Sequence, residues 1–207
     1  MPKVSRSYLA ARRNQILDAA VACFAREGFH RATMQDIVAQ SKLSPGAIYN
    51  YFDSKEEIIE AIADERHARE QAFIAAAQKQ SNVADALTHI RDAFFSDLTD
   101  PKERLRRRVS VQLWAEAQRN PKILKLVRRG IDQPRKLLCA LIAKGQRRKE
   151  IPRELDPDAT ARFMIAVFHG FVLQAEWDHH VAVEPYVEVL DICLQRMLGG
   201  TASKPGR

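Results

Sequence analysis

Apolar residues recur along this chain at the three- and four-residue spacing that places them on one face of an α-helix. The first such run extends from Leu9 to Phe24 and is followed by Gly28, a residue type that often ends helices. A comparable run spans Asn82 to Asp97. No segment shows a convincing two-residue alternation of the kind that indicates a strand. The pattern predicts an all-α protein of about nine helices.

Capping residues mark the expected helix starts. The segments 33–36 and 54–57 have the form of capping boxes. In a capping box the hydroxyl of the first residue and the carboxylate three residues later each accept a hydrogen bond from the backbone N–H group of the other residue. Proline is well suited to the first position of a helix, where its missing N–H group would be unpaired anyway. The sequence places a capping or acidic residue before proline at Ser44-Pro45, Asp100-Pro101, Asn120-Pro121, Asp156-Pro157 and Glu184-Pro185. Each pair predicts a helix start. Pro134, inside a helical pattern, is expected to kink or divide its helix.

Short helices give way to long ones near residues 50–80. We expect an N-terminal domain over residues 1–55, a long connecting helix over 54–79 and a helical domain over 80–200. The last helix is expected to end at Gly199-Gly200, and the tail 201–207 to be disordered.

Composition narrows the class of protein. The chain has 207 residues, of which 46% are hydrophobic, so it can bury a sizeable core. It has no apolar run long enough to span a membrane and no apolar stretch of a signal peptide behind Met1. Its three widely spaced cysteines exclude a disulfide scaffold and favour a reducing cytoplasm. We therefore expect a cytoplasmic protein.

The signatures of catalysis and metal binding are missing from the sequence. It contains no HExxH, no GxSxG and no paired ExxH, so we expect no enzyme and no cofactor. Asp178-His179-His180 is more typical of a surface helix end than of a metal site, because no further Cys/His cluster supports it.

Charge is distributed unevenly around a net value of +7. Residues 102–150 hold sixteen Lys and Arg against four Asp and Glu, whereas residues 56–101 hold four against ten. Three interpretations of the basic block are open. It forms a solvated face that the acidic segment balances, it attracts DNA at long range, or it binds an anionic effector.

Residues 33–55 are the most informative segment. Two short helices flank the turn Ser41-Lys42-Leu43-Ser44, and the second helix begins with the small residues Pro45, Gly46 and Ala47. Such a helix can approach a surface closely, which suits a recognition helix entering the major groove of DNA. Nearby hydroxyls and a lysine are of the kind that contact phosphates. The alternative is an ordinary helical hairpin.

The spacing of particular residues favours the first interpretation. Thirteen residues within the stretch from Ile16 to Ile58 hold positions of one signature: Phe24, Gly28, Phe29, Thr33, Ile37, Ser44, Gly46, Ile48, Tyr49, Phe52, Ser54, Lys55 and Glu56. This stretch resembles the TetR family of bacterial transcriptional regulators, and the length and helix count agree over the whole chain. Lys42 stands where the family usually has glycine, so we expect a left-handed backbone there. Val38 replaces a small residue.

The resemblance implies DNA-binding roles for Thr33, Gln35, Lys42, Ser44, Pro45, Gly46, Ala47, Tyr49, Asn50, Tyr51 and Lys55. It assigns phosphates to Thr33, Tyr49 and Lys55, and the base-facing end of the helix to Gly46 and Ala47. On this basis, Lys55→Ala is expected to weaken DNA binding with little effect on folding.

The segment 113–121 is similar to the subgroup that contains the choline-responsive BetI repressors. In the TetR family the C-terminal helices usually hold an effector and form a dimer. The candidate pocket residues are Phe94, Trp114, Phe168, His169, Phe171, Gln174 and Trp177, for which plain core packing is the alternative.

The sequence thus predicts a TetR-like homodimer that binds a palindromic double-stranded DNA operator and is released by a small-molecule effector. We expect no membrane partner. The alternative is a basic helical module that binds RNA or another polyanion without sequence specificity.

Overall fold

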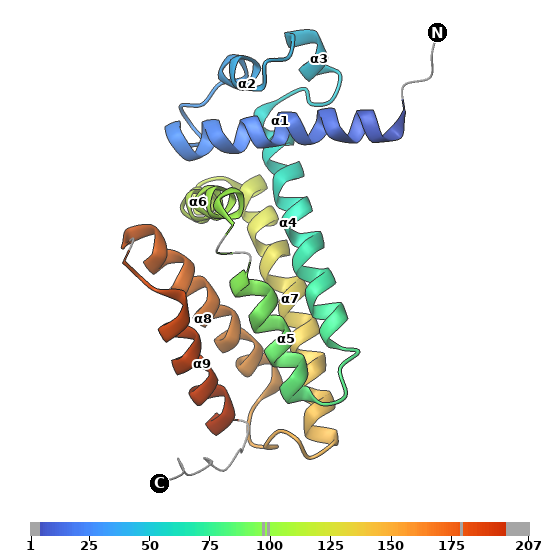
Figure 1. The fold of residues 1–207 in the computed structure, drawn as a ribbon, viewed down its shortest axis with the longest axis vertical. Helices are drawn as coiled ribbons and strands as arrows, with labels where there is room; N and C mark the ends of the chain where they lie inside the picture. The colour runs from blue at the N-terminus through green and yellow to red at the C-terminus, as the bar shows by residue number, and fades with distance from the viewer. Residues whose placement is uncertain (1–4, 97, 99, 179, 198–207) are drawn as a thin grey trace. The chain divides into compact units, whose positions relative to one another are not determined.

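The computed structural model describes residues 5–96, 98, 100–178 and 180–197. Over these residues the chain forms nine α-helices and no strand, which confirms the all-α prediction (Figure 1). The helices are α1 (Arg6–Glu27), α2 (Met34–Ser41), α3 (Pro45–Tyr49), α4 (Lys55–Ala77), α5 (Val83–Ser96), α6 (Pro101–Glu116), α7 (Pro121–Arg147), α8 (Pro157–Trp177) and α9 (Val183–Met197). No described helix is long and apolar enough to cross a membrane.

Most predicted helix starts are confirmed, because capping depends on residues adjacent in sequence. Asp100 and Asp156 cap α6 and α8, each with proline at the following position. The side chain of Asn120 accepts hydrogen bonds from the N–H groups of Lys122 and Ile123 at the start of α7. Gly28 ends α1 with a φ of 83°, a conformation that favours glycine.

Two expectations about proline are corrected. Pro134 does not divide its helix, because α7 runs as one element through it, and a kink at this residue stays a prediction. Pro185 does not open α9, which already begins at Val183. Gly199-Gly200 and the tail 201–207 lie outside the described residues.

The chain divides into two compact units. Unit 1 comprises residues 1–69 and 98–130, and unit 2 comprises residues 70–97 and 131–207. The long helices α4 and α7 each contribute residues to both units. The division of α7 falls after Gly130, next to the hydrogen bond that Pro134 cannot make.

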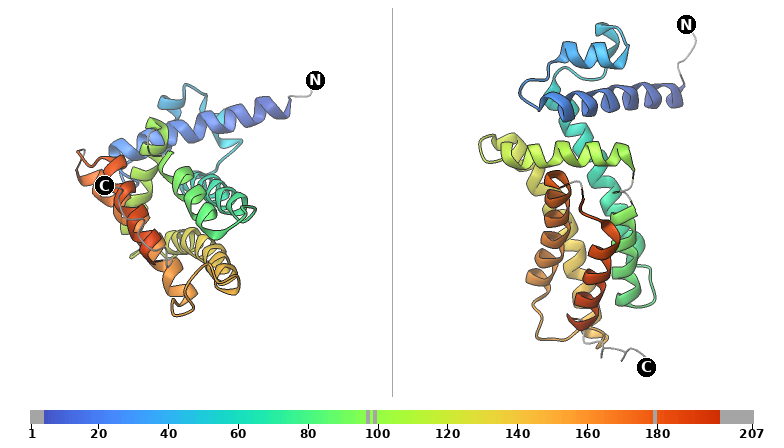
Figure 2. Two further views of the ribbon diagram at one scale, coloured as in Figure 1. Left: turned by 60° about the horizontal axis from the view of Figure 1, so that its bottom comes forward. Right: turned by 60° about the vertical axis from the view of Figure 1, so that its left-hand side comes forward.

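In unit 1, α1 is the central element. Figures 1 and 2 show α2 and α3 on one side of α1 and α6 on the other. The second half of α1 is buried from Ile16 to Ala25, and Phe24 is fully covered. Ile37 and Ile48 bring α2 and α3 onto this core, and both are completely buried. Helices this short are marginal alone, so α1 is what keeps α2 and α3 folded.

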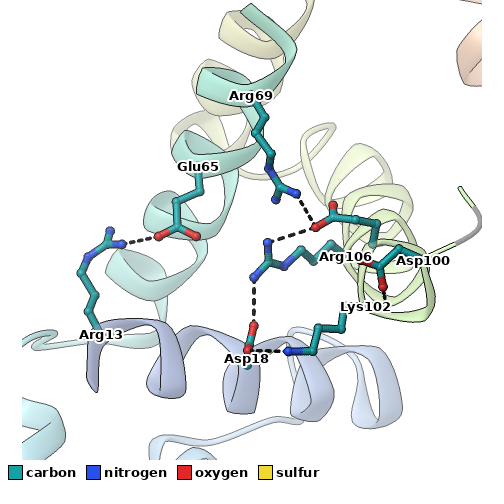
Figure 3. A network of polar contacts seen from close by, with 8 residues as sticks. Arg13, Asp18, Glu65, Arg69, Asp100, Lys102 and Arg106 are labelled. Carbon is teal, nitrogen blue, oxygen red and sulfur yellow. Dashed lines mark hydrogen bonds and ion pairs between the residues drawn. The ribbon is translucent and has the colours of Figure 1, made fainter. Parts of the chain in front are cut away.

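Charged side chains join α1, α4 and α6 within unit 1 (Figure 3). Arg106 of α6 donates to Asp18 of α1 at 2.9 Å and to Glu103 of its own helix at 3.2 Å. Glu103 is buried and also accepts from Arg69 of α4, while Arg13 of α1 pairs with Glu65 of α4. The network fixes α1 against the helices that support it.

Unit 2 has its own apolar core between α5, α7 and α8. Leu87, Ile142 and Met164 are among its buried members. Beside it lies a cluster of aromatic rings, and the Tyr186 hydroxyl of α9 donates to the Val167 carbonyl of α8 at 3.0 Å. The view on the right of Figure 2 shows α8 and α9 side by side.

Candidate nucleic-acid interface

A capping box fixes the start of α2, as the sequence predicts. The Thr33 hydroxyl oxygen accepts from Asp36 N–H at 3.2 Å, and the Asp36 carboxylate accepts from Thr33 N–H at 2.8 Å. The hydrogen bonds from the Thr33 side chain and backbone lower the pKa of Asp36 below its usual value. Thr33 and Gln35 are both exposed, so the start of α2 is open to a partner.

The turn between α2 and α3 has the left-handed backbone expected at Lys42. Its φ and ψ are 58° and 26°, a conformation that lysine adopts at a cost and glycine adopts freely. The side chain of Lys42 is exposed. The sharp turn therefore carries a positive charge where a glycine would carry none.

Local hydrogen bonds set the start of α3. Ser44 is the N-cap, with its hydroxyl accepting from Ala47 N–H at 3.3 Å, and Pro45 occupies the first helical position. The helix is only five residues long. Ile48 anchors it to the core, because this side chain is fully buried.

The opposite face of α3 is open. Ser44, Pro45, Gly46, Tyr49 and Asn50 are exposed, and half of the Tyr49 side chain is accessible. A Cβ atom added at Gly46 would meet nothing within 4 Å, so internal packing does not require glycine there. A small residue in open space leaves room for the edge of another molecule. This arrangement suits a helix whose N-terminal end enters a DNA groove.

Three of the proposed DNA-binding residues are partly covered. Ala47 is half-buried, and Tyr51 packs against the core of unit 1. The Lys55 ammonium donates to the carbonyl oxygens of Phe29, His30 and Ala32 at 2.8, 3.2 and 3.2 Å. It also lies 4.8 Å from the centre of the Phe29 ring.

These contacts correct the expectation that Lys55 is dispensable for folding. The lysine holds the loop between α1 and α2 against the start of α4, and its phosphate-binding role stays a proposal. Sequence spacing cannot reveal this contact, because the carbonyl oxygens lie more than twenty residues away along the chain.

Sequence reasoning missed Gln15, which connects α1 to the turn. Its side-chain amide donates to the carbonyl oxygen of Ser41, the last residue of α2, at 2.7 Å. Its carbonyl oxygen accepts from Arg12 at 2.7 Å. A polar residue directly before the buried run that begins at Ile16 was the available signal.

Positive charge is concentrated in the unit that contains α3. Unit 1 holds twenty Lys and Arg against twelve Asp and Glu, whereas unit 2 holds thirteen against fourteen. Ten of the twenty lie in residues 98–130, so ten of the sixteen Lys and Arg in the basic block belong to unit 1. A net positive unit is expected of a protein that binds a polyanion.

The candidate pocket residues fall into separate groups. Phe94, Phe168 and Phe171 come together in unit 2, where the rings of Phe94 and Phe168 are 4.3 Å apart at their centres. His169 is half-buried beside them in sequence, and Gln174 is exposed. Trp177 is 76% exposed at the end of α8. Trp114 belongs to unit 1 and is half-buried on α6.

Two of the cavities that the described residues form each lie within one unit, and neither is lined by these residues. One of about 510 Å³ in unit 2 lies between the start of α5, the turn after α7 and the end of α9. The Arg91–Asp191 ion pair borders it. The other, of about 410 Å³ in unit 1, lies between the first turns of α4 and α7. The described residues contain no group of three or more His, Cys, Asp or Glu that could hold a metal ion.

The exposed, capped α3, joined to α2 by a short turn and anchored to the core by Ile48, defines a helix-turn-helix DNA-binding protein. Comparison with known families agrees. The model described as bacterial regulatory proteins, tetR family, matches residues 16–62, and that of the BetI-type transcriptional repressor C-terminal domain matches residues 83–199. The chain belongs to the TetR family and has a BetI-type C-terminal domain. It is a DNA-binding transcriptional regulator and not an enzyme.

Individual proteins are similar over most of the chain. The nicotine-responsive repressor HdnoR of Paenarthrobacter nicotinovorans is 26% identical, covering 79% of this chain and 82% of its own. The structure of GusR from Salmonella enterica has a TM-score of 0.75 at 28% identity, covering 95% and 98%. A Saccharomonospora viridis regulator in complex with choline has a TM-score of 0.76 at 22% identity, covering 90% and 96%, and shows the fold alone.

Proposed function

We propose that this protein is a homodimeric repressor that binds a palindromic operator and is released from it by a small-molecule effector. The observation that carries the proposal is the open face of α3, which presents Gly46, Tyr49 and Asn50 on a helix anchored by Ile48. In this proposal, residues 1–55 read DNA, and residues 80–200 bind the effector and form the dimer.

Roles at the interface follow from side-chain chemistry. Thr33, Tyr49 and Lys42 are exposed hydroxyls and a cation suited to phosphate oxygens, and Lys55 contributes its remaining charge beside the loop that it holds. Gly46, Ala47 and Asn50 meet base edges. Ser44 and Pro45 orient α3. Gln35 and Tyr51 contact the DNA backbone on either side of this helix.

A footprint on DNA tests this function directly. The purified full chain is incubated with the region upstream of its own gene, and protection from cleavage is mapped. We expect two protected half-sites related by a two-fold axis. Uniform protection at every position, with equal affinity for RNA, would instead favour the nonspecific polyanion-binding module.

Tyr49→Phe tests the phosphate role of α3. Removing the exposed hydroxyl leaves the buried side of the helix intact, so folding should be unchanged. Affinity should fall equally for the operator and for random duplex, because phosphate contacts carry no sequence information. Fluorescence anisotropy on both duplexes measures this, and a loss confined to the operator would assign the hydroxyl to a base instead.

The exposed apolar side chains of α8 and α9 support the dimer. Phe163, Val189 and Ile192 are 53%, 61% and 50% exposed, although such residues usually lie inside. A second copy of these helices would cover them. A two-fold interface uses the same patch on both subunits, which also places two α3 helices on one DNA molecule.

The aromatic cluster of unit 2 supports an effector site. Phe94, Phe168 and Phe171 supply apolar surface, and His169 and Gln174 on the same helix supply polar groups. The sequence also predicts Trp177, at the end of α8, and Trp114, in unit 1, as effector contacts. A related fold has been solved with choline, and HdnoR responds to nicotine. Thermal-shift screening with small molecules identifies the effector, and Trp114→Ala should abolish its release of DNA while operator binding remains.

A further inference from the structure

The first half of α1 extends beyond the core of unit 1. None of the residues from Arg6 to Gln15 is buried, whereas burial begins at Ile16. Residue 16 is also where the match to the TetR-family model begins. Tyr8 and Leu9 are 50% and 44% exposed. Core packing therefore does not explain why these turns are helical or why they carry an aromatic ring.

The two adjacent arginines of this segment point to different neighbours. Arg13 pairs with Glu65 of α4 and lies 5.6 Å from the centre of the Phe52 ring, so it serves the fold. Arg12 instead donates to Gln15, whose amide donates to Ser41 at the helix-turn-helix turn. Arg12 therefore lies on the side of α1 that leads to α2 and α3.

Tyr8 and Arg12 contact each other on that side of α1. They are one helical turn apart, and the Arg12 guanidinium lies 5.0 Å from the centre of the Tyr8 ring. The Gln15 carbonyl oxygen accepts from only one guanidinium nitrogen, so the other donors can reach a second acceptor. A guanidinium fixed by a ring and an amide, with an exposed phenol beside it, suits a phosphate oxygen.

We propose that Tyr8 and Arg12 are a second DNA contact, which clamps a backbone phosphate next to the segment read by α3. The ligand is duplex DNA, because the pair is cationic and continuous with the helix-turn-helix turn through Gln15 and Ser41. The contact adds affinity and fixes the approach of the turn without reading bases. This inference rests on the proposed operator binding.

The test compares two arginines at opposite ends of the same helix. The full-length wild type, Arg12→Gln and Arg26→Gln are titrated onto the footprinted operator and a random duplex of equal length at several KCl concentrations. Arg26 is the matched control, because it is exposed at the far end of α1 beside Glu27. Circular dichroism melts verify that all three proteins fold alike.

Arg12→Gln should weaken binding about 5- to 10-fold on both duplexes and reduce the slope of log K against log salt by about one. Tyr8→Phe should weaken both about 2- to 5-fold with the slope unchanged. Arg26→Gln should match the wild type. An unchanged slope for Arg12→Gln, or an equal loss for Arg26→Gln, would overturn the clamp. If the wild type itself prefers no operator, the proposed function fails, but the slopes on random duplex still decide the clamp.

Discussion

Gly130 has no side chain, which allows α7 and α4 to pack closely at this position. A Cβ atom built on Gly130 of α7 would lie 2.2 Å from the Nε2 atom of His67 on α4, and His67 is 6% exposed. Because His67 is buried, its imidazole ring or one of the two helices would have to move to admit a methyl group. The contact therefore depends on glycine for space and not for backbone freedom.

Gly130→Ala should lower the free energy of unfolding by about 1–3 kcal/mol, because the added methyl group overpacks a filled site. Gly170→Ala in α8 is the matched control, since its Cβ would meet nothing within 4 Å. That variant should be neutral or more stable by about 0.5–1 kcal/mol, because alanine is the better helix former. Urea unfolding of both variants measures the difference, and equal effects would contradict the packing argument.

The same histidine makes stability depend on pH. Burial, together with the positive charges of Arg66 and Arg129, lowers the pKa of His67 from 6.5 to about 4. Below pH 6.5 the unfolded chain therefore binds a proton that the folded protein does not. The contribution of neutral His67 is complete above pH 6.5 and falls as the pH falls toward 4.

His67→Gln should remove this component. Between about pH 7 and pH 4.5 the wild type should lose up to about 3 kcal/mol more stability than the variant. His180→Gln, at an exposed position, should follow the wild type. Unfolding free energies across this pH range provide the comparison. Parallel curves for the wild type and His67→Gln would show that His67 is not the group responsible.

At the scale of elements, Lys55 connects a loop to a helix. Its ammonium is held by three carbonyl oxygens of the loop between α1 and α2. Lys55→Ala should lower the free energy of unfolding by about 1.5–3 kcal/mol, because hydrogen bonds to a charged group are lost. Lys42→Ala removes the same charge from an exposed position and should change stability little. Chemical denaturation of both proteins decides whether Lys55 has this structural role.

Elements defined by adjacent residues were predictable from the sequence. Thr33, Ser44, Asp100 and Asp156 cap helices where the sequence placed them, because each cap needs only a side chain two or three residues from a free N–H group. The left-handed turn at Lys42 was predicted from the family resemblance, because glycine usually occupies that position. Elements that depend on tertiary contacts were not, and Pro134 lies inside a continuous α7 against the local rule.

For the candidate site, too, the features set by local sequence were predictable and those set by tertiary contacts were not. The exposed face of α3 follows from helical periodicity around buried Ile48. The contacts of Gln15 and Lys55 join residues more than twenty positions apart, so no spacing rule detects them. The candidate pocket mixes both cases: three phenylalanines come together in unit 2, whereas exposure of Trp177 depends on where α8 ends.

For the whole molecule, the exposed surface of α8 and α9 predicts the assembly state. Ile192→Asp places a charge in a patch that the proposed partner would cover, and it should give monomers at micromolar concentration. Leu105→Asp introduces the same charge at an exposed position of α6 and should leave the dimer intact. Sedimentation equilibrium of the full chain separates these outcomes. If Ile192→Asp remained dimeric, the interface would have to lie on another surface.

The placement of the two tryptophans gives the protein an optical signal of its own. Trp177 is 76% exposed in the single chain, whereas Trp114 is half-buried on α6. An indole in water emits at longer wavelength than one in an apolar environment. Covering α8 with a second subunit would therefore move the emission of Trp177 to shorter wavelength. In Trp114→Phe, dilution would report association through Trp177 alone, without an attached dye.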